Sequence, residues 1–160
     1  MKSLKNRKNS FLSGPETFQY HYLNKYIQKL VYDILFTYDI KVGSIITNFE
    51  MDDINLNMDT AIPLGLLTNE LITNIVKHAF PESKGTITIK LKYVADKIEF
   101  TIADDGIGIP TDIDFENSDT LGLEIVKNLV NQLEGDFNIE NINGTEFKMI
   151  FKELKYKVRR

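Results

Sequence analysis

The chain has 160 residues, a formal net charge of −4 and an apolar fraction of 42%, values typical of one globular domain. It contains no cysteine, which excludes a disulfide framework and a thiolate zinc site and suits a reducing compartment. No apolar run reaches transmembrane length, and the amino-terminus lacks the apolar stretch of a signal peptide. We therefore expect a cytoplasmic protein without direct membrane insertion.

Both ends of the chain are basic, whereas the body is acidic. The first ten residues hold four cations and no acid, and residues 152–160 hold five cations and one glutamate. Residues 1–15 end in a Ser-Gly-Pro linker signature, so we expect polar tails at 1–15 and 154–160 around a domain that spans 16–153. The body lacks basic patches with interleaved aromatic residues, and we expect no nucleic acid as a partner.

The first predicted elements are a helix and a β-rich stretch. Apolar residues recur at helical spacing from residue 16 or 17 to about Tyr38. Gly43 then precedes a predicted strand over residues 44–50, and a short second strand is expected near residues 54–56.

A longer helix follows this stretch. Asp59 or Thr60 is its expected amino-terminal cap, with Pro63 in the first turn, where proline is tolerated. The helix is expected to stop at Phe80, because Pro81 disfavours helical geometry in the residue before it.

This second helix carries a polar stripe. Glu70, Asn74, Lys77 and His78 stand at positions i, i+4, i+7 and i+8, which lie along one side of a helix. The stripe combines an acid, an amide oxygen of the kind that binds metal ions, an ammonium group and an imidazole. Taken alone, such a stripe is more often ordinary surface than a site.

A second polar motif lies about thirty residues further on. Two strands are predicted over residues 86–94 and 97–103, joined by a tight turn, and Asp104 follows directly. Gly106 and Gly108 come next, so a hydrogen-bond acceptor stands beside a backbone that a ligand can approach closely. A plain strand-ending turn is the alternative explanation for this motif.

The remaining elements complete the predicted fold. Residues 109–119 are predicted as a loop, and Thr120 begins a helix that reaches about residue 133 and is capped by Gly135. A last hairpin pairs residues 136–141 with 145–153 around Asn143-Gly144. Helices and mostly antiparallel strands in this order predict an α+β fold, a two-layer sandwich.

Four motifs, taken together in this order, resemble the ATP-binding domain of sensor histidine kinases with a short ATP lid. They are IPLGLLTNELITNIVKHAFP, DDGIGIP, LGLEIVKNLVNQLEG and GTEFKMIF, which correspond to the N, G1 and G2 boxes and the closing hairpin. The family also includes DNA gyrase, the Hsp90 chaperones and the MutL repair proteins. The resemblance covers roughly residues 17–152 and implies a Bergerat-type fold, a mixed, mostly antiparallel sheet covered on one face by helices.

The resemblance also implies ATP and Mg²⁺ as ligands. Asn74 would supply an oxygen to Mg²⁺, Glu70 would orient the acceptor imidazole or take its proton, and Asp104 would accept a hydrogen bond from the adenine 6-amino group. The other implied ATP-binding residues are Lys77, Gly122 and Leu123 at the phosphates, His78 and Thr145 near the adenine, and Gly106 and Gly108, which let the backbone pass the nucleotide.

The implied activity is transfer of the γ-phosphoryl of Mg-ATP to a histidine on a separate dimerisation and phosphoacceptor domain, with a response regulator receiver domain downstream. The segment that contains Gly122 has one glycine where many family members have two or three. The only histidines are His21 and His78, and neither has the sequence context of a phosphorylated histidine. We therefore expect the acceptor to lie elsewhere.

Two other functions remain open. A stand-alone serine kinase like the anti-sigma factor kinases is favoured by the missing acceptor histidine and opposed by the wording of the N box. A non-catalytic nucleotide-binding module is disfavoured by intact Glu70, Asn74 and Asp104. A gyrase-type clamp would need a transducer domain and a longer lid.

Overall fold

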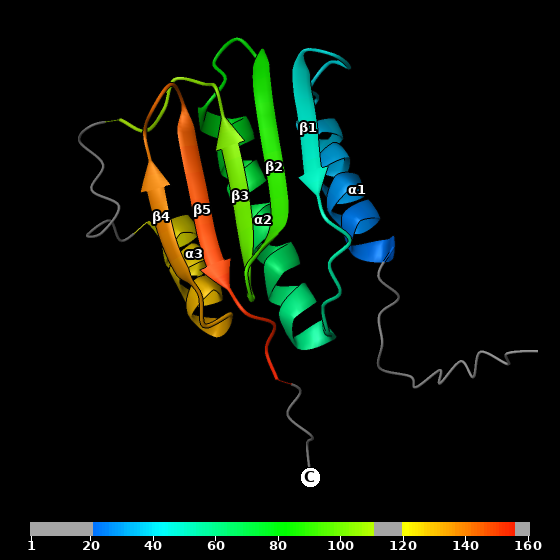
Figure 1. Ribbon diagram of the computed structural model, residues 1–160. Helices are drawn as coiled ribbons and strands as arrows, with labels where there is room; N and C mark the ends of the chain where they lie inside the picture. The colour runs from blue at the N-terminus through cyan, green and yellow to red at the C-terminus, as the bar shows by residue number, and fades with distance from the viewer. Residues whose placement is uncertain (1–20, 111–119, 156–160) are drawn as a thin grey trace, which may run out of the picture.

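The computed structural model describes residues 21–110 and 120–155. In these residues the chain forms three helices and five strands, and the helices all cover one face of the sheet (Figure 1). The elements in chain order are α1 (His21–Thr37), β1 (Ile45–Met51), α2 (Met58–His78), β2 (Gly85–Val94), β3 (Lys97–Asp104), α3 (Leu121–Gln132), β4 (Asp136–Glu140) and β5 (Thr145–Phe151). No helix among the described residues is long and apolar enough to cross a membrane.

The sheet has the strand order β1-β2-β3-β5-β4. β1 and β2 are parallel and are joined through α2, as parallel neighbours require a crossover connection. All other neighbouring strands are antiparallel. The predicted α+β two-layer sandwich with a mixed, mostly antiparallel sheet is confirmed.

The core lies between the sheet and the helices. Side chains alternate between the two faces of a strand, and every second residue of β2 and β3 points into this layer. Each fully buried aliphatic side chain contributes about 1.5–3 kcal/mol relative to an exposed one, so this layer dominates the stability. The fully buried members include Ile27, Val31, Leu64, Leu67, Ile72, Ile87, Ile89, Leu91 and Phe100.

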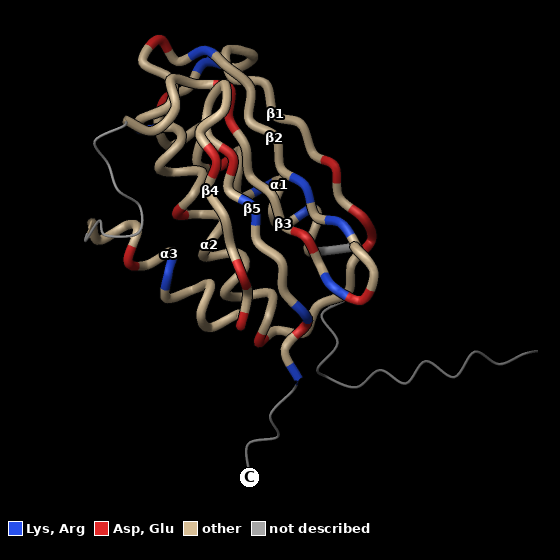
Figure 2. Tube along the Cα trace, turned by 60° about the vertical axis from the view of Figure 1, so that its left-hand side comes forward, with Lys and Arg blue, Asp and Glu red and all other residues tan. Residues whose placement is uncertain are grey.

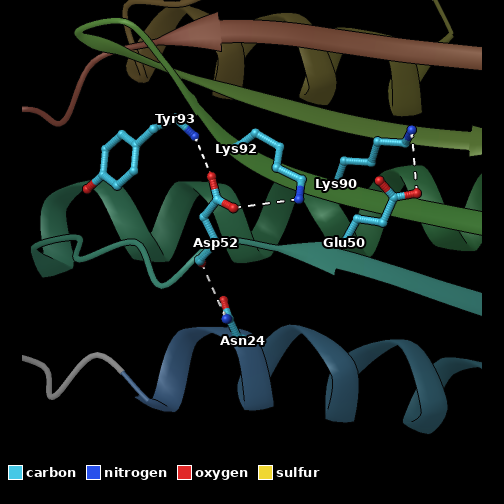
Figure 3. A network of polar contacts seen from close by, with 6 residues as sticks. All are labelled: Asn24, Glu50, Asp52, Lys90, Lys92 and Tyr93. Atoms are coloured by element: carbon cyan, nitrogen blue, oxygen red, sulfur yellow. Dashed lines mark hydrogen bonds and ion pairs between the residues drawn. The ribbon is translucent and has the colours of Figure 1, made fainter.

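Acidic residues at the end of β1 lie beside lysines of β2, as the red and blue segments of the trace show (Figure 2). Lys90 Nζ lies 3.5 Å from Glu50 Oε1, and Lys92 Nζ lies 3.5 Å from Asp52 Oδ1 (Figure 3). Asp52 Oδ2 also accepts from the backbone N–H of Tyr93 at 2.9 Å. These pairs are partly exposed, so each is worth at most about 1 kcal/mol, and they fix strand register more than they stabilise the fold.

The predicted strand near residues 54–56 is wrong. β1 ends at Met51, and the chain then leaves the sheet through a turn in which the N–H of Ile54 donates to the carbonyl of Asp52 at 2.8 Å. Ile54 and Leu56 are 0% and 4% exposed, so their alternation reflects a connection that fills the core and not a paired strand.

The predicted cap of α2 is also wrong. Asn57 is the cap, because its side-chain oxygen accepts from the backbone N–H of Thr60 at 3.0 Å. Pro63 therefore lies beyond the first turn. Leu154, the first residue of the predicted carboxyl-terminal tail, donates its N–H to Thr60 Oγ1 at 2.9 Å and accepts from Asn57 Nδ2.

The turns later in the chain are close to the predictions. The β2–β3 hairpin turns at Ala95, with a φ of 57°, and the β4–β5 hairpin turns at Asn143 and Gly144, with φ values of 52° and 115°. At the end of α3 the left-handed residue is Glu134, one before the predicted Gly135. The N–H of Gly135 completes the cap by donating to the carbonyl of Val130 at 3.1 Å.

Candidate nucleotide site

A cavity of about 630 Å³ lies between α2, α3 and the ends of β3, β4 and β5. Its walls are mostly apolar, with a few polar groups at defined positions, which is the usual character of a small-molecule site. The lining residues are Leu71, Asn74, Ile75, His78, Ala79, Ile102, Asp104, Ile107, Gly108, Ile109, Pro110, Thr120, Gly122, Leu123, Val126, Ile139, Thr145 and Phe147.

Asp104 is the only buried ionisable residue among those that the structure describes, at 7% exposure. It ends β3 opposite Thr145 of β5, and its Oδ1 accepts from the N–H of Gly106 at 2.9 Å. Burial raises the pKa of its carboxyl and the neighbouring Asp105 charge adds to the rise, while the N–H groups of Gly106 and Thr145 oppose it. The carboxylate is thus an acceptor in the cavity wall that a ligand donor would stabilise.

Gly106 does not line the cavity, although the sequence predicts it as a nucleotide contact. A Cβ at this position would lie 2.3 Å from the carbonyl oxygen of Ala79, so the glycine allows the chain to pass the end of α2. The N–H of Ile107 donates to the same carbonyl at 3.0 Å. Gly108, with a φ of +75°, does line the cavity.

The polar stripe of α2 divides at Asn74. Successive residues turn by about 100° around a helix, so His78 lies about 40° to one side of Asn74 and Lys77 about 60° to the other. Asn74 and His78 line the cavity, whereas the ammonium of Lys77 lies 5.8 Å from the ring centre of Tyr38. Glu70 is half-buried one turn before Asn74, outside the lining.

The amino-terminus of α3 borders the cavity opposite Asn74. Gly122 and Leu123 both line it, and a Cβ at Gly122 would lie 3.7 Å from both polar atoms of the Asn74 side chain. The cap residue Thr120 makes no side-chain capping bond. The first N–H groups of the helix thus receive no capping bond from the Thr120 side chain, and the amino-terminal end of the helix dipole favours an anion.

The described residues contain no group of three or more His, Cys, Asp or Glu side chains that could hold a metal ion. Among the described cavity residues, the Asn74 amide oxygen could bind a cation whose other ligands are oxygens of a bound molecule and water. This ligand set fits Mg²⁺, which retains several waters and binds through few protein oxygens.

The structure thus places most of the predicted site residues around one cavity: Asn74, His78, Asp104, Gly108, Gly122, Leu123 and Thr145. Glu70, Lys77 and Gly106 lie outside its lining. Sequence reasoning did not identify the apolar walls or Asn141, whose side chain makes two hydrogen bonds to Ile109. In the sequence analysis Asn141 is only the last residue of the predicted strand 136–141, whereas β4 ends at Glu140. Residues 111–119 of the predicted lid lie outside the described residues.

Comparisons with known proteins identify the family of the chain. Residues 59–155 match the family described as histidine kinase-, DNA gyrase B-, and HSP90-like ATPase. Blue-light-activated histidine kinase 2 of Erythrobacter litoralis is 34% identical over 99 residues, which is 61% of this chain and 29% of that protein. Sensor histidine kinase PdtaS of Mycobacterium tuberculosis is 35% identical over 89 residues, 54% of this chain and 18% of that protein.

Solved structures agree as well. The histidine kinase domain of the Erythrobacter litoralis EL346 blue-light activated histidine kinase superposes with a TM-score of 0.73 at 30% identity, covering 81% of this chain and 60% of that one. The catalytic domain of histidine kinase ThkA shares the fold, with a TM-score of 0.62 at 22% identity over 79% of this chain and 92% of that one.

The chain belongs to the histidine kinase-, DNA gyrase B- and HSP90-like ATPase family. Within that family it is a catalytic ATPase domain of the two-component sensor histidine kinase type. It spans less than a third of the length of the curated relatives described above.

Proposed function

We propose that this domain, with a short ATP lid, transfers the γ-phosphoryl of Mg-ATP in the cytoplasm to a histidine on a separate dimerisation and phosphoacceptor domain. A response regulator receiver domain would then take the phosphoryl group. One observation carries the proposal: a single cavity has a buried carboxylate, Asp104, in one wall and the amino-terminus of a helix, α3, beside Asn74 in another. That combination suits a ligand with a hydrogen-bond donor at one end and phosphates at the other.

Asp104 would bind the adenine. Its carboxylate can accept from the 6-amino group of adenine, whereas guanine presents an oxygen acceptor at that position and would be repelled. Thr145 pairs with Asp104 across β3 and β5 and lines the same part of the cavity, so it would complete the adenine contacts. His78 would stack near the base.

Asn74 and the start of α3 would bind the triphosphate. The backbone N–H groups of Gly122 and Leu123 would donate to phosphate oxygens, and Asn74 would place its oxygen on Mg²⁺. Magnesium supplies the charge that offsets the developing charge of the transferred phosphoryl group. For Lys77 to reach a phosphate, its ammonium would have to swing away from Tyr38.

Glu70 would act on the acceptor. It stands one turn before Asn74 on α2 and outside the cavity lining, which would leave it available to the acceptor while the nucleotide fills the cavity. We propose that it orients the acceptor imidazole or takes its proton as the phosphorus–nitrogen bond forms.

Serine phosphorylation is the second candidate. The chain has only two histidines, and His78 lies in the wall of the nucleotide cavity. Because His21 also lacks the sequence context of a phosphorylated histidine, we expect the acceptor on another domain or protein, and this expectation is met equally by a partner's serine. The same nucleotide site would serve both reactions, so the chemistry of the labelled product distinguishes them.

Replacing Asn74 tests the nucleotide site. Asn74→Ala should abolish Mg²⁺-dependent ATP binding in calorimetry and leave the circular dichroism spectrum unchanged, because this side chain lines the cavity and not the core. Asn128→Ala, on the exposed side of α3, is the matched control and should bind ATP normally. An unfolded Asn74→Ala variant would show that Asn74 is structural, and unchanged ATP binding would contradict the proposal.

A further inference from the structure

One wall of the cavity is a segment without secondary structure. Ile107, Gly108, Ile109 and Pro110 all line the cavity, yet none of them belongs to a strand or helix. Ile107 is 68% exposed, an apolar surface that a ligand in the cavity would cover. A wall of this kind keeps its shape only if other groups hold its backbone in place.

The start of the segment is held by backbone contacts. Asp105 and Thr86 exchange two hydrogen bonds, from Asp105 N–H to the Thr86 carbonyl at 3.2 Å and from Thr86 N–H to Asp105 Oδ1 at 2.6 Å. The N–H of Ile107 then donates to the carbonyl of Ala79 at 3.0 Å. These contacts fix the turn that follows Asp104, and they do not reach Ile109.

Among the described residues, the far end is held by the side chain of Asn141, from the turn between β4 and β5. Its Oδ1 accepts from the N–H of Ile109 at 3.1 Å, and its Nδ2 donates to the carbonyl of the same residue at 2.8 Å. The carboxamide thus satisfies both polar groups of one residue, as a paired strand would. A Cβ at Gly108 would lie 2.2 Å from Asn141 Oδ1, so this close approach also requires the glycine.

We infer that Asn141 is a positioning residue for nucleotide binding: its carboxamide holds the Gly108–Pro110 wall at the spacing that the adenine requires. The inference rests on the function proposed above, because the ligand is taken to be ATP. Asp104 precedes the wall by a few residues and is fixed independently by the Gly106 N–H and by β5. Loss of Asn141 would therefore release the apolar wall without moving the carboxylate.

Asn141 is exposed, and its hydrogen bonds lie at the surface of the molecule. Contacts of this kind open locally without unfolding the domain. When the wall samples open positions, a smaller fraction of the molecules is ready to bind ATP. The apparent affinity is the intrinsic affinity multiplied by that fraction. The expected consequence is a loss of affinity with a loss of stability of similar size, about 1.4 kcal/mol for a tenfold effect, in a variant that still folds.

The test compares Asn141→Ala with Asn138→Ala, an exposed asparagine of β4 whose amide donates to Glu140 at 3.0 Å. We measure Mg-ATP binding by calorimetry, and amide hydrogen exchange without nucleotide by NMR. Asn141→Ala should bind Mg-ATP about tenfold more weakly, the effect of losing one or two hydrogen bonds. The amide of Ile109 should exchange faster in this variant only, and both variants should remain folded, with the thermal midpoint of Asn141→Ala a few degrees lower.

Each other outcome is decisive. Unchanged Mg-ATP affinity in a folded Asn141→Ala variant would overturn the positioning role, and an unprotected Ile109 amide in the wild-type chain would do so without any variant. A wild-type chain that protects this amide but binds no Mg-ATP would instead refute the proposed nucleotide function. Should Asn141→Ala fail to fold where Asn138→Ala folds, Asn141 is structural and the inference fails.

Discussion

Asp104 combines a cost to the fold with a proposed function in binding. Its pKa is raised, chiefly by burial, so the folded protein holds the proton more tightly than the unfolded chain does. Stability from this group is therefore fully present below the unfolded pKa and is lost as the pH rises through the folded pKa. At neutral pH the ionised carboxylate destabilises the domain.

Asp104→Asn should separate these two effects. The free energy of unfolding should rise at neutral pH, because a neutral amide replaces a buried charge, and the gain should vanish in acid, where the wild-type carboxyl is protonated. The free energy of ATP binding should become less favourable by about 1.5–3 kcal/mol, the usual contribution of a hydrogen bond to a charged group. Urea unfolding and calorimetry measure the two quantities. Unchanged ATP affinity, or equal binding of GTP and ATP by the wild-type chain, would contradict the adenine assignment.

The affinity for ATP should also depend on pH through Asp104. The adenine 6-amino group donates to the ionised form, so binding weakens once the carboxyl takes up a proton. Because burial raises this pKa, the decline on acidification should begin at a higher pH than an ordinary aspartate would give. Calorimetric titrations over a pH series measure it, and Asp104→Asn should lose this component of the decline. The same decline in both proteins would assign it to another group.

At the scale of the elements, the site depends on how closely α2 approaches its neighbours. A Cβ added at Gly106 would lie 2.3 Å from the Ala79 carbonyl oxygen, which is too close. A Cβ added at Gly122 would lie 3.7 Å from the Asn74 side chain, which is an ordinary contact. The same substitution therefore has opposite expected effects at these two glycines.

Gly106→Ala should destabilise the domain by about 1–3 kcal/mol, because the backbone has to shift away from the end of α2. Gly122→Ala should leave stability unchanged or raise it by up to about 1 kcal/mol, because alanine favours a helix more than glycine does. Chemical denaturation of both variants measures the difference. Equal destabilisation by the two substitutions would show that the packing at Ala79 is not the cause.

The elements themselves were largely predictable, and the errors have physical causes. Periodic apolar residues and the Asn143-Gly144 turn predicted most of the helices and strands. Ile54 and Leu56 alternate like a strand, yet no neighbouring strand is available to pair with them. The predicted cap of α2 was wrong because Asp59 and Thr60, which follow Asn57 closely, are also suitable amino-terminal cap residues.

For the whole molecule, the predictable part of the site was its polar part. Asn74, Asp104 and Gly122 come from α2, β3 and α3, and the two-layer fold brings them around one cavity. Helical spacing alone did not predict the direction of Lys77. It lies three residues after Asn74, on the side of the helix away from His78, and its ammonium lies over the ring of Tyr38. The contact between Asn141 and Ile109 joins the β4–β5 turn to the segment after β3, 32 residues apart, and no local pattern predicts such a contact.

The most direct test of the central claim is phosphoryl transfer in trans. The chain is incubated with γ-labelled Mg-ATP, alone and with a phosphoacceptor domain that carries a histidine in a kinase sequence context. The account predicts acid-labile label on the added domain and almost none on the chain itself, because the reaction depends mainly on positioning two substrates. Glu70→Ala should then lower the transfer rate more than the ATP affinity. Acid-stable label on the serine of an added partner, or stoichiometric acid-labile label on His21 of the isolated chain, would contradict the account.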